Sequence, residues 1–190
     1  MSRGRSAKSP RSGIEIMDSN VSLRVATLQD LQSLPNIYKE FHNFHAESIP
    51  DRLVSITDQQ DGRDETNLFQ KLNKIIQSED SEIFIAEANR EPIGLAEIYL
   101  RQDEINPLTV PYRYVYPQSL IITNSYRRQG IGTQLMKMVE GWAKERGVSE
   151  IRLDIWEFNE GPLPFYRQMG YQTLKRTMVH QICKEQESNG

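Results

Sequence analysis

The stretch Arg127–Thr133 reads Arg-Arg-Gln-Gly-Ile-Gly-Thr, and it constrains the fold of this chain more than any other segment. It follows an apolar run at 120–122 that is typical of a strand. It precedes apolar residues at helical spacing: Leu135, Met136, Val139, Trp142 and Ala143. The pattern therefore predicts a glycine-rich turn that opens a helix. Such a turn presents free backbone N–H groups and the positive end of the helix dipole, where a phosphate oxygen can bind. Because Gly130 and Gly132 have no Cβ, a ligand can approach this backbone closely.

Two other phosphate-binding loops can be tested against this turn. The Walker pattern, which ends in Gly-Lys and a hydroxyl residue, follows neither glycine. The dinucleotide fingerprint needs a third glycine three residues after Gly132, where Leu135 stands. Asp154 lies near the distance at which that fingerprint expects an acidic residue, so a nicotinamide site is weakened but stays open. The turn alone is also compatible with a purely structural glycine loop.

A second motif follows a predicted strand at 150–156, in which apolar and polar residues alternate. Pro162 suits the first turn of a helix, and Gly170 suits a left-handed residue at a helix C-terminus. The spacing therefore predicts a short helix between two strands, the second at 173–182.

With both motifs in this order, the chain resembles a GNAT-type N-acetyltransferase, a superfamily that uses acetyl-coenzyme A. The family's phosphate loop has Gln or Arg, then a glycine three residues on, then Gly or Ala two residues further; Arg127, Gly130 and Gly132 fill these places. The later motif is filled at the family's spacing by Asn159, Phe165, Tyr166, Gly170 and Tyr171. Pro162 replaces the usual alanine, and Asn124 stands where proline is common. The resemblance is strong over about residues 112–182.

The resemblance implies an α/β fold of the mixed α+β kind, the GNAT acyltransferase fold. Its central, mostly antiparallel sheet has six to seven strands, splays at the cofactor cleft and is flanked by about four helices. It also implies acetyl-coenzyme A as cosubstrate; separately, the spacing of histidine and cysteine predicts no metal. The residues implied to bind the cosubstrate are Leu120, Ile121, Ile122, Arg127, Arg128, Gln129, Gly130, Ile131, Gly132, Thr133, Asn159 and Tyr166.

The resemblance also implies catalytic roles. Tyr166 is expected to give a proton to the departing thiolate, whereas Phe165 is expected to pack. Glu97 is a candidate general base, although a strand glutamate is more often on the surface and a water relay is an alternative. His45 and Glu47 are candidates to line the acceptor pocket.

Other features leave alternatives open. Tyr112, Tyr114 and Tyr116 alternate along one predicted strand and could shape a pocket, a dimer surface or the sheet itself. Cys183 has no histidine partner in the pattern, so we expect direct attack by the amine rather than an acyl-cysteine.

Composition limits the remaining classes. The 190 residues carry 23 Lys and Arg against 26 Asp and Glu, a formal charge of −3, which argues against a general nucleic-acid binder. No apolar run approaches the ~18–20 residues of a membrane span. The single cysteine cannot form an internal disulfide, which fits a cytoplasmic protein. The three histidines and this cysteine lack metal-ligand spacing.

Along the chain, we expect a disordered basic tail at 1–20, one N-acetyltransferase domain at 21–184 and a short tail at 185–190. The other predicted elements are a strand at 23–25, a helical region from Leu28 that Pro35 interrupts, a flexible segment at 57–66, a helix through 68–76, an antiparallel hairpin of strands 83–88 and 93–101, a loop at 102–111 and a long strand at 112–122 that is bulged near Pro117. Thr27 and Asp30 have the spacing of a helix N-cap.

These observations predict transfer of an acetyl group from acetyl-coenzyme A to a primary amine by direct attack in a ternary complex. The expected acceptor is a small-molecule or peptide amine, without nucleic acid or membrane, and a homodimer is possible. One alternative is an inactive acyl-coenzyme A sensor of the same fold. Another is a nucleotide-binding domain of a different fold.

Overall fold

The computed structural model describes residues 15–16, 21–56, 61–157 and 161–180. The chain divides into two compact units, Met1–Asp154 and Ile155–Gly190, and each is described separately.

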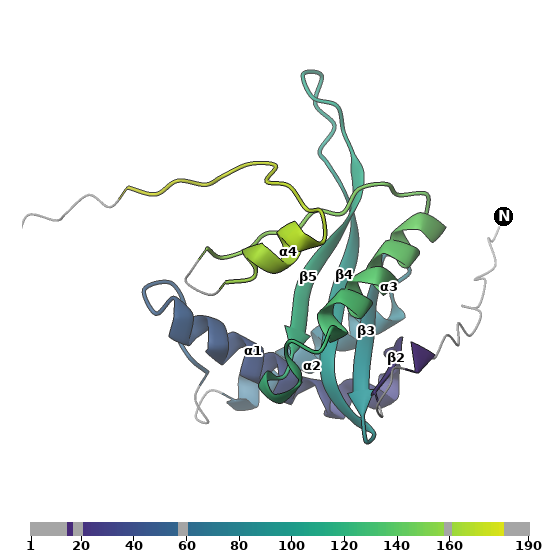
Figure 1. Ribbon diagram of the computed structural model, residues 1–190, viewed down its shortest axis with the longest axis vertical. Helices are drawn as coiled ribbons and strands as arrows, with labels where there is room; N and C mark the ends of the chain where they lie inside the picture. Colours follow the sequence, from purple (N-terminus) through teal and green to yellow (C-terminus); the bar gives the residue numbers. More distant parts are fainter. Residues whose placement is uncertain (1–14, 17–20, 57–60, 158–160, 181–190) are drawn as a thin grey trace, which may run out of the picture. The chain divides into compact units, whose positions relative to one another are not determined.

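The first unit is built on an antiparallel sheet in which strands adjacent in the sequence are adjacent in space (Figure 1). Its strands are β1 (Glu15–Ile16), β2 (Val21–Val25), β3 (Ser81–Ala88), β4 (Glu91–Gln102) and β5 (Arg113–Ile122). The predicted count of six to seven strands is not confirmed, because the described residues give five. The short β1 also lies within the predicted N-terminal tail, so that prediction is wrong for these two residues, which pair with β2.

The hydrophobic core lies on one face of this sheet, under η1 (Leu28–Gln32), α1 (Leu34–Ser48) and α2 (Asp61–Gln77). Strand residues alternate between faces, and Leu95 and Ile121 point into this core. Glu97 and Tyr99 follow Leu95 at intervals of two, so they lie on the same face. On the opposite face α3 (Ile131–Glu145) packs against β3, β4 and β5.

The helical region after β2 begins with a capping box. Thr27 accepts a hydrogen bond from the Gln29 N–H, and the Asp30 carboxylate accepts one from the Thr27 N–H at 2.7 Å, as the sequence predicted. The predicted interruption near Pro35 is a break between η1 and α1, since proline is tolerated in a first helical turn.

The predicted flexible segment at 57–66 is partly wrong, because α2 already begins at Asp61; residues 57–60 lie outside the described part. The polarity of this segment therefore did not distinguish a loop from the start of a helix.

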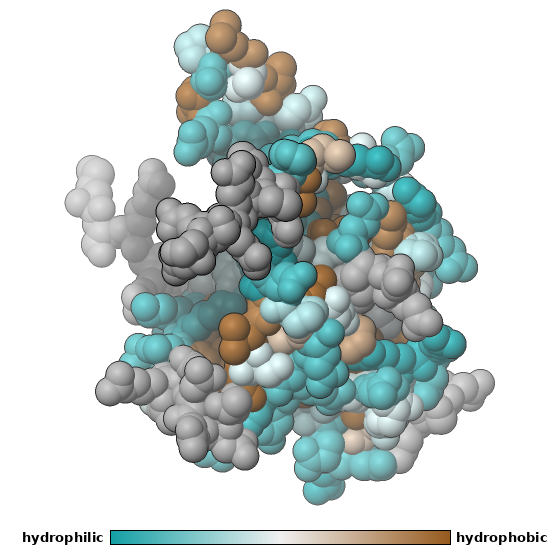
Figure 2. All heavy atoms as spheres, turned by 90° about the vertical axis from the view of Figure 1, so that its left-hand side faces the viewer, coloured by the Kyte–Doolittle hydropathy of each residue, from teal (hydrophilic) through white to brown (hydrophobic). Residues whose placement is uncertain are grey.

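The β3–β4 hairpin is confirmed, with Asn89 (φ +52°) and Arg90 (φ +69°) both left-handed in its turn. Two positive φ values in a two-residue connection match the twist of antiparallel strands. The predicted loop between β4 and β5 is also confirmed. It exposes Ile105, Leu108 and Val110. Figure 2 shows apolar side chains gathered on the projection at its top, which is where this loop lies in Figure 1.

The register between β4 and β5 shifts where the sequence predicted a bulge. Glu97 pairs with Ser119, and Ile98 pairs with Pro117, so Gln118 is the additional residue of β5.

The predicted strand at 150–156 is reduced to a single parallel bridge between Val115 and Ile151. The Val115 N–H donates to the Glu150 carbonyl, and the Arg152 N–H donates to the Val115 carbonyl, both at 3.0 Å. The next rung of a parallel ladder would require an N–H at residue 117. Pro117 has none, so pairing cannot continue beyond the first rung.

The second unit contains the predicted short helix, α4 (Leu163–Gln168), which follows Pro162. Gly170 has φ +89°, the left-handed conformation that its position predicted. The last predicted strand, 173–182, is wrong over 173–180, which have no regular structure and no paired strand; 181–182 lie outside the described part. No helix in the described ranges has the length and apolarity to cross a bilayer.

Candidate functional site

The turn between β5 and α3 has the backbone geometry of an anion-binding loop. Gly130 is the N-cap of α3 with φ +81°, and no side chain caps this helix. The N–H groups of Ile131, Gly132 and Thr133 occupy the first turn, where no carbonyl of the helix itself can accept from them. An added Cβ at Gly130 would meet nothing within 4 Å, so the space around the cap is open. The chemistry of these donors fits a diphosphate.

Helix α1 holds the start of this loop through two side chains. Glu40 Oε1 accepts a hydrogen bond from the Asn124 N–H at 3.0 Å, at the start of η2 (Asn124–Tyr126). The Arg127 guanidinium lies 4.4 Å from the centre of the Phe44 ring, and its Nε donates to the Ile122 carbonyl at 3.0 Å. Arg127 thus braces the loop with its side chain, and its N–H donates to Asn124 at 3.3 Å.

The three predicted residues at the end of β5 do not present their backbones alike. The Thr123 N–H donates to the Ile93 carbonyl, which places the main chain of Thr123 and Ile121 toward β4. By alternation the main chain of Leu120 and Ile122 points away from β4. Only these two can pair with an extended ligand along the open edge of β5, and the Ile122 carbonyl already accepts from Arg127.

Glu97 is a buried charge rather than a surface glutamate, with no exposed area. Its Oε2 accepts a hydrogen bond from the Tyr38 hydroxyl at 2.6 Å, and its Oε1 accepts one from the Tyr99 hydroxyl at 2.6 Å. Lys71 Nζ lies 2.8 Å from Oε1 and forms an ion pair with it. One carboxylate thus joins α1, α2 and β4.

The two phenols that bind Glu97 are neutral donors. Burial, together with the Glu97 carboxylate, raises the pKa of Tyr38 well above its usual range. Burial and the hydrogen bond to Glu97 also raise the pKa of Tyr99. Both hydroxyls therefore keep their protons at neutral pH, and Lys71 is the basic side chain that pairs with Glu97.

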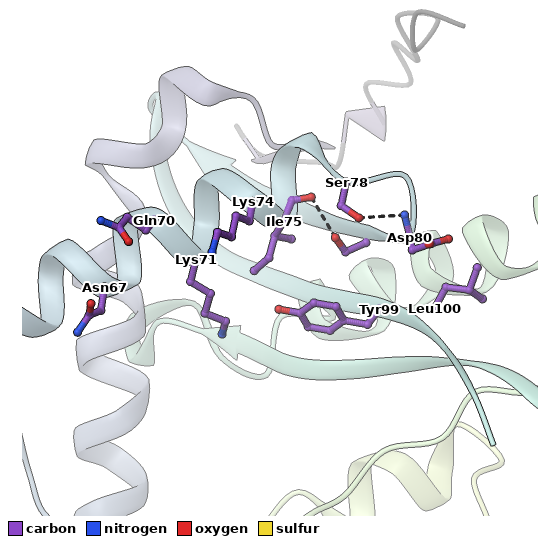
Figure 3. A pocket seen from close by; sticks show the side chains of 10 residues that line it. Asn67, Gln70, Lys71, Lys74, Ile75, Ser78, Asp80, Tyr99 and Leu100 are labelled. Atoms are coloured by element: carbon purple, nitrogen blue, oxygen red, sulfur yellow. Dashed lines mark hydrogen bonds between the residues drawn. The ribbon is translucent and has the colours of Figure 1, made fainter. Parts of the chain in front are cut away.

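A cavity of about 440 Å³ lies between α2 and the end of β4, beside this cluster (Figure 3). Both groups that bind Glu97 Oε1, Lys71 and Tyr99, line it. Lys74, one turn further along α2, lines it as well.

Tyr114 and Tyr116 of β5 lie on the face of the sheet that carries Glu97 and Tyr99. Tyr116 pairs with Tyr99, and the Arg101 guanidinium lies 3.7 Å from the centre of its ring. The Tyr116 hydroxyl donates to Asp154 at 2.9 Å. Tyr114 pairs with Arg101. Their predicted roles in a pocket or a dimer stay predictions.

His45 and Glu47 of α1, which were predicted to line the acceptor pocket, do not line the cavity described above. His45 Nδ1 lies 2.9 Å from the Phe41 carbonyl, and its ring packs edge-on against Phe41 and Phe44. Glu47 is exposed. Local packing accounts for the position of His45.

Tyr166 belongs to the second unit, where it lies on α4 between two other rings. The ring centres of Phe165 and Tyr171 are 5.0 and 5.4 Å from its own. Its side chain is buried, and burial raises the pKa of Tyr166 to about 12. The phenol therefore holds its proton at neutral pH, as a general acid must. Asn159 and Cys183 lie outside the described residues.

The sequence profile of the Acetyltransferase (GNAT) family matches residues 36–171. The chain belongs to this family.

Relatives of this family member act on different amines. A thialysine N-epsilon-acetyltransferase from Bos taurus is 32% identical over 62 residues, which span 33% of this chain and only 36% of that enzyme. An aminoglycoside N(6')-acetyltransferase type 1 from Salmonella typhimurium is 24% identical over 107 residues, 56% of this chain and 73% of that enzyme.

Solved structures share the fold. A mutant of the BH1408 protein from Bacillus halodurans superposes with a TM-score of 0.75 at 23% identity, covering 85% of this chain and 99% of that one. The aminoglycoside acetyltransferase AAC(6')-Iy, solved with a bisubstrate analogue of coenzyme A, superposes with a TM-score of 0.64 at 19% identity, covering 87% of this chain and 100% of that one. The alternative of a nucleotide-binding domain of another fold is therefore wrong.

Sequence reasoning about this GNAT family member missed the partners of Glu97. Tyr38 falls in the predicted helical region and Tyr99 in the predicted strand at 93–101, and neither they nor Lys71 were singled out as site residues. Lys71 precedes the apolar Leu72 of α2, so helical spacing alone could have placed it at the edge of the core.

Proposed function

We propose that the chain is an N-acetyltransferase that moves an acetyl group from acetyl-coenzyme A to a primary amine by direct attack in a ternary complex. The observation that carries this proposal is the uncapped first turn of α3 behind the left-handed Gly130. It offers three N–H donors and an open approach immediately after an edge strand. Family membership supports the acyl-transfer chemistry, and the named activities of both groups of relatives support an amine as acceptor.

In this proposal the amides of Ile131, Gly132 and Thr133 hold the diphosphate of the cosubstrate, with Arg128 and Gln129 at the rim of the loop. The backbone of Leu120 and Ile122 holds the extended arm. Bound acetyl-coenzyme A supplies an activated acyl carbon as a thioester. An N–H at this edge of β5 polarises the thioester carbonyl, which is where negative charge develops on attack.

Two side chains move protons. Glu97 takes a proton from the acceptor amine, and Tyr166 gives one to the departing thiolate sulfur. A buried phenol whose pKa is about 12 is weak as an acid in water, but a thiolate in a closed site can draw its proton. General acid catalysis of this kind contributes roughly 10²–10⁴-fold to a rate.

The test combines calorimetry with acetyl-coenzyme A and turnover on a panel of amines, including thialysine, lysine and an aminoglycoside. An enzyme binds the cosubstrate and acetylates at least one acceptor. Tyr166→Phe should then lower kcat by roughly 10²-fold or more with little change in cosubstrate affinity. Tyr171→Phe, which keeps the neighbouring ring, is the matched control.

Cosubstrate binding without turnover on any amine would favour the inactive sensor instead. The absence of binding by folded protein would remove both proposals.

A further inference from the structure

The buried Glu97 carboxylate is reached by a side chain that is itself half exposed. The Lys71 side chain retains 47% of its exposure, whereas that of Glu97 retains none, yet Nζ lies 2.8 Å from Oε1. Figure 3 shows Lys71 extending from α2 across the cavity toward the Tyr99 side. One flexible ammonium therefore joins the cavity to a carboxylate that lies in the core.

The Lys71 ammonium compensates the charge of the buried Glu97 carboxylate. Tyr38 and Tyr99 donate hydrogen bonds to the carboxylate but carry no charge. Among the residues that the structure describes, Lys71 is the one cation within ion-pair distance of Glu97. A buried carboxylate without a counter-charge is strongly disfavoured, so a group that displaces Lys71 must bring positive charge with it.

The acceptor of the proposed reaction is chemically the same group as the end of Lys71, a primary ammonium on an alkyl chain. We infer that Glu97 is the binding site for the acceptor's ammonium, and that Lys71 occupies this position in the free protein until the acceptor displaces it. The inference rests on the proposed function. It makes Lys71 a determinant of specificity: a protonated amine can take over the pair with Glu97, and a neutral alcohol cannot.

The cavity provides room for this exchange. Lys71, Tyr99, Asn67 and Gln70 are among its lining residues, so the lysine stem already lies at its wall. Rotation of the four-carbon stem moves the ammonium from Glu97 toward solvent without a change in the backbone of α2.

The exchange also sets the order of proton movements. The bound ammonium gives one proton to Glu97, and the free nitrogen lone pair attacks the thioester carbonyl carbon. A nitrogen–carbon bond forms, the carbon–sulfur bond breaks and the thiolate takes up a proton. The acylated nitrogen loses its second proton, so one proton in total is released to water per acetyl group transferred.

Chemical rescue tests the site without any turnover. Lys71→Ala removes a propylammonium group and should lower the thermal unfolding midpoint. We expect n-propylammonium chloride to raise that midpoint by several degrees in a saturable manner, because a ligand of the native state stabilises it. 1-Propanol, which has the same shape without the charge, should not do so.

Matched variants show whether the response to n-propylammonium depends on Glu97. Lys74→Ala removes the same charge from the same cavity wall, and Lys74 forms no ion pair with any described residue, so its midpoint should not respond. The double variant Lys71→Ala with Glu97→Gln should also lose the response. An equal response of Lys74→Ala, a response that survives Glu97→Gln, or no response of Lys71→Ala would overturn the inference.

Steady-state kinetics then test whether ammonium binding at Glu97 is part of acetyl transfer. With acetyl-coenzyme A and n-propylamine, Lys71→Ala should show a KM for the amine lower than that of the wild type by roughly tenfold or more, since the internal competitor is gone. An unchanged KM would contradict the displacement. If neither protein binds acetyl-coenzyme A in calorimetry, the proposed function fails, while the thermal response still decides whether Glu97 binds ammonium groups.

If Lys71→Ala does not fold, the wild type itself can be tested. Acylation by an amine-reactive reagent, followed by peptide mass spectrometry, should modify Lys71 more slowly than Lys74. Because n-propylamine also consumes the reagent, the quantity compared is the ratio of modification at Lys71 to modification at Lys74. Added n-propylammonium should raise this ratio, and 1-propanol should not. Equal rates at the two lysines, or no effect of n-propylammonium, would refute the displacement.

Discussion

Tyr38 and Glu97 lie 59 residues apart in the chain, yet the Tyr38 hydroxyl donates a 2.6 Å hydrogen bond to Glu97 Oε2. This bond joins α1 to the interior strand β4. The same helix holds the start of the glycine-rich loop through Glu40 and Phe44. Helix α1 therefore connects the candidate diphosphate site to the candidate amine site.

Tyr38→Phe should destabilise the protein because it leaves a buried carboxylate with one donor fewer. We expect the free energy of unfolding to fall by about 1–3 kcal/mol in urea titrations. Tyr114→Phe is the control, since the Tyr114 hydroxyl forms no hydrogen bond with the described residues, and its effect should stay within about 0.5 kcal/mol. Similar losses in both variants would show that the bond contributes nothing specific.

Two glycines at the start and middle of α3 should respond in opposite directions to alanine. Gly130 has φ +81°, so Gly130→Ala should destabilise the protein by about 1–2 kcal/mol and weaken binding of acetyl-coenzyme A. Gly141 lies inside the helix with nothing within 4 Å of an added Cβ, so Gly141→Ala should stabilise it by roughly 0.5–1 kcal/mol. Unfolding curves and calorimetry measure both effects. If Gly130→Ala changed neither the stability nor the binding of acetyl-coenzyme A, the left-handed conformation at Gly130 would be contradicted.

Gly94→Ala should disturb the end of β5 through direct contact. An added Cβ would lie 2.7 Å from the Ile121 carbonyl oxygen and 2.7 Å from Ile122 Cδ1. Because the first of these is backbone, relief requires the two strands to move apart. We expect a loss of about 1–3 kcal/mol in stability together with weaker cosubstrate binding. If the Gly94→Ala protein were destabilised but bound acetyl-coenzyme A with wild-type affinity, the end of β5 would not be part of the cosubstrate site.

Alkaline pH should weaken the fold partly through Tyr166. Its pKa is raised from 10.0 to about 12 by burial, so the folded protein retains a proton that the unfolded chain loses. The stabilisation is complete below pH 10 and is lost as pH rises toward about 12. Tyr166→Phe should therefore show a smaller loss of stability over this range than the wild type, by on the order of 2 kcal/mol. Unfolding by urea at a series of pH values measures the difference, and parallel curves for the two proteins would contradict it.

Local signals in the sequence were sufficient for much of the first unit. The Thr27 capping box, the break at Pro35, the β3–β4 turn and the left-handed positions at Gly130 and Gly170 each depend on a few adjacent residues. The burial of Glu97 could not be predicted in this way. It depends on α1 and α2 covering the same face of β4, and long-range packing of this kind leaves no periodic signal in a single strand.

Two predicted strands, 150–156 and 173–182, are not formed as predicted, and the first of them was predicted from alternation. Alternation identifies residues that can lie in a sheet, but a strand also needs an adjacent chain whose N–H and C=O groups are available. Residues 150–156 have such a neighbour only at Val115.

Pro117 has a consequence for engineering as well as for folding. A residue other than proline at position 117 would restore the N–H that the next rung of hydrogen bonds toward Arg152 requires. In the proposed function the extended arm of the cosubstrate binds along this edge of β5, so this substitution is a direct way to obstruct its binding while leaving the glycine-rich loop unchanged.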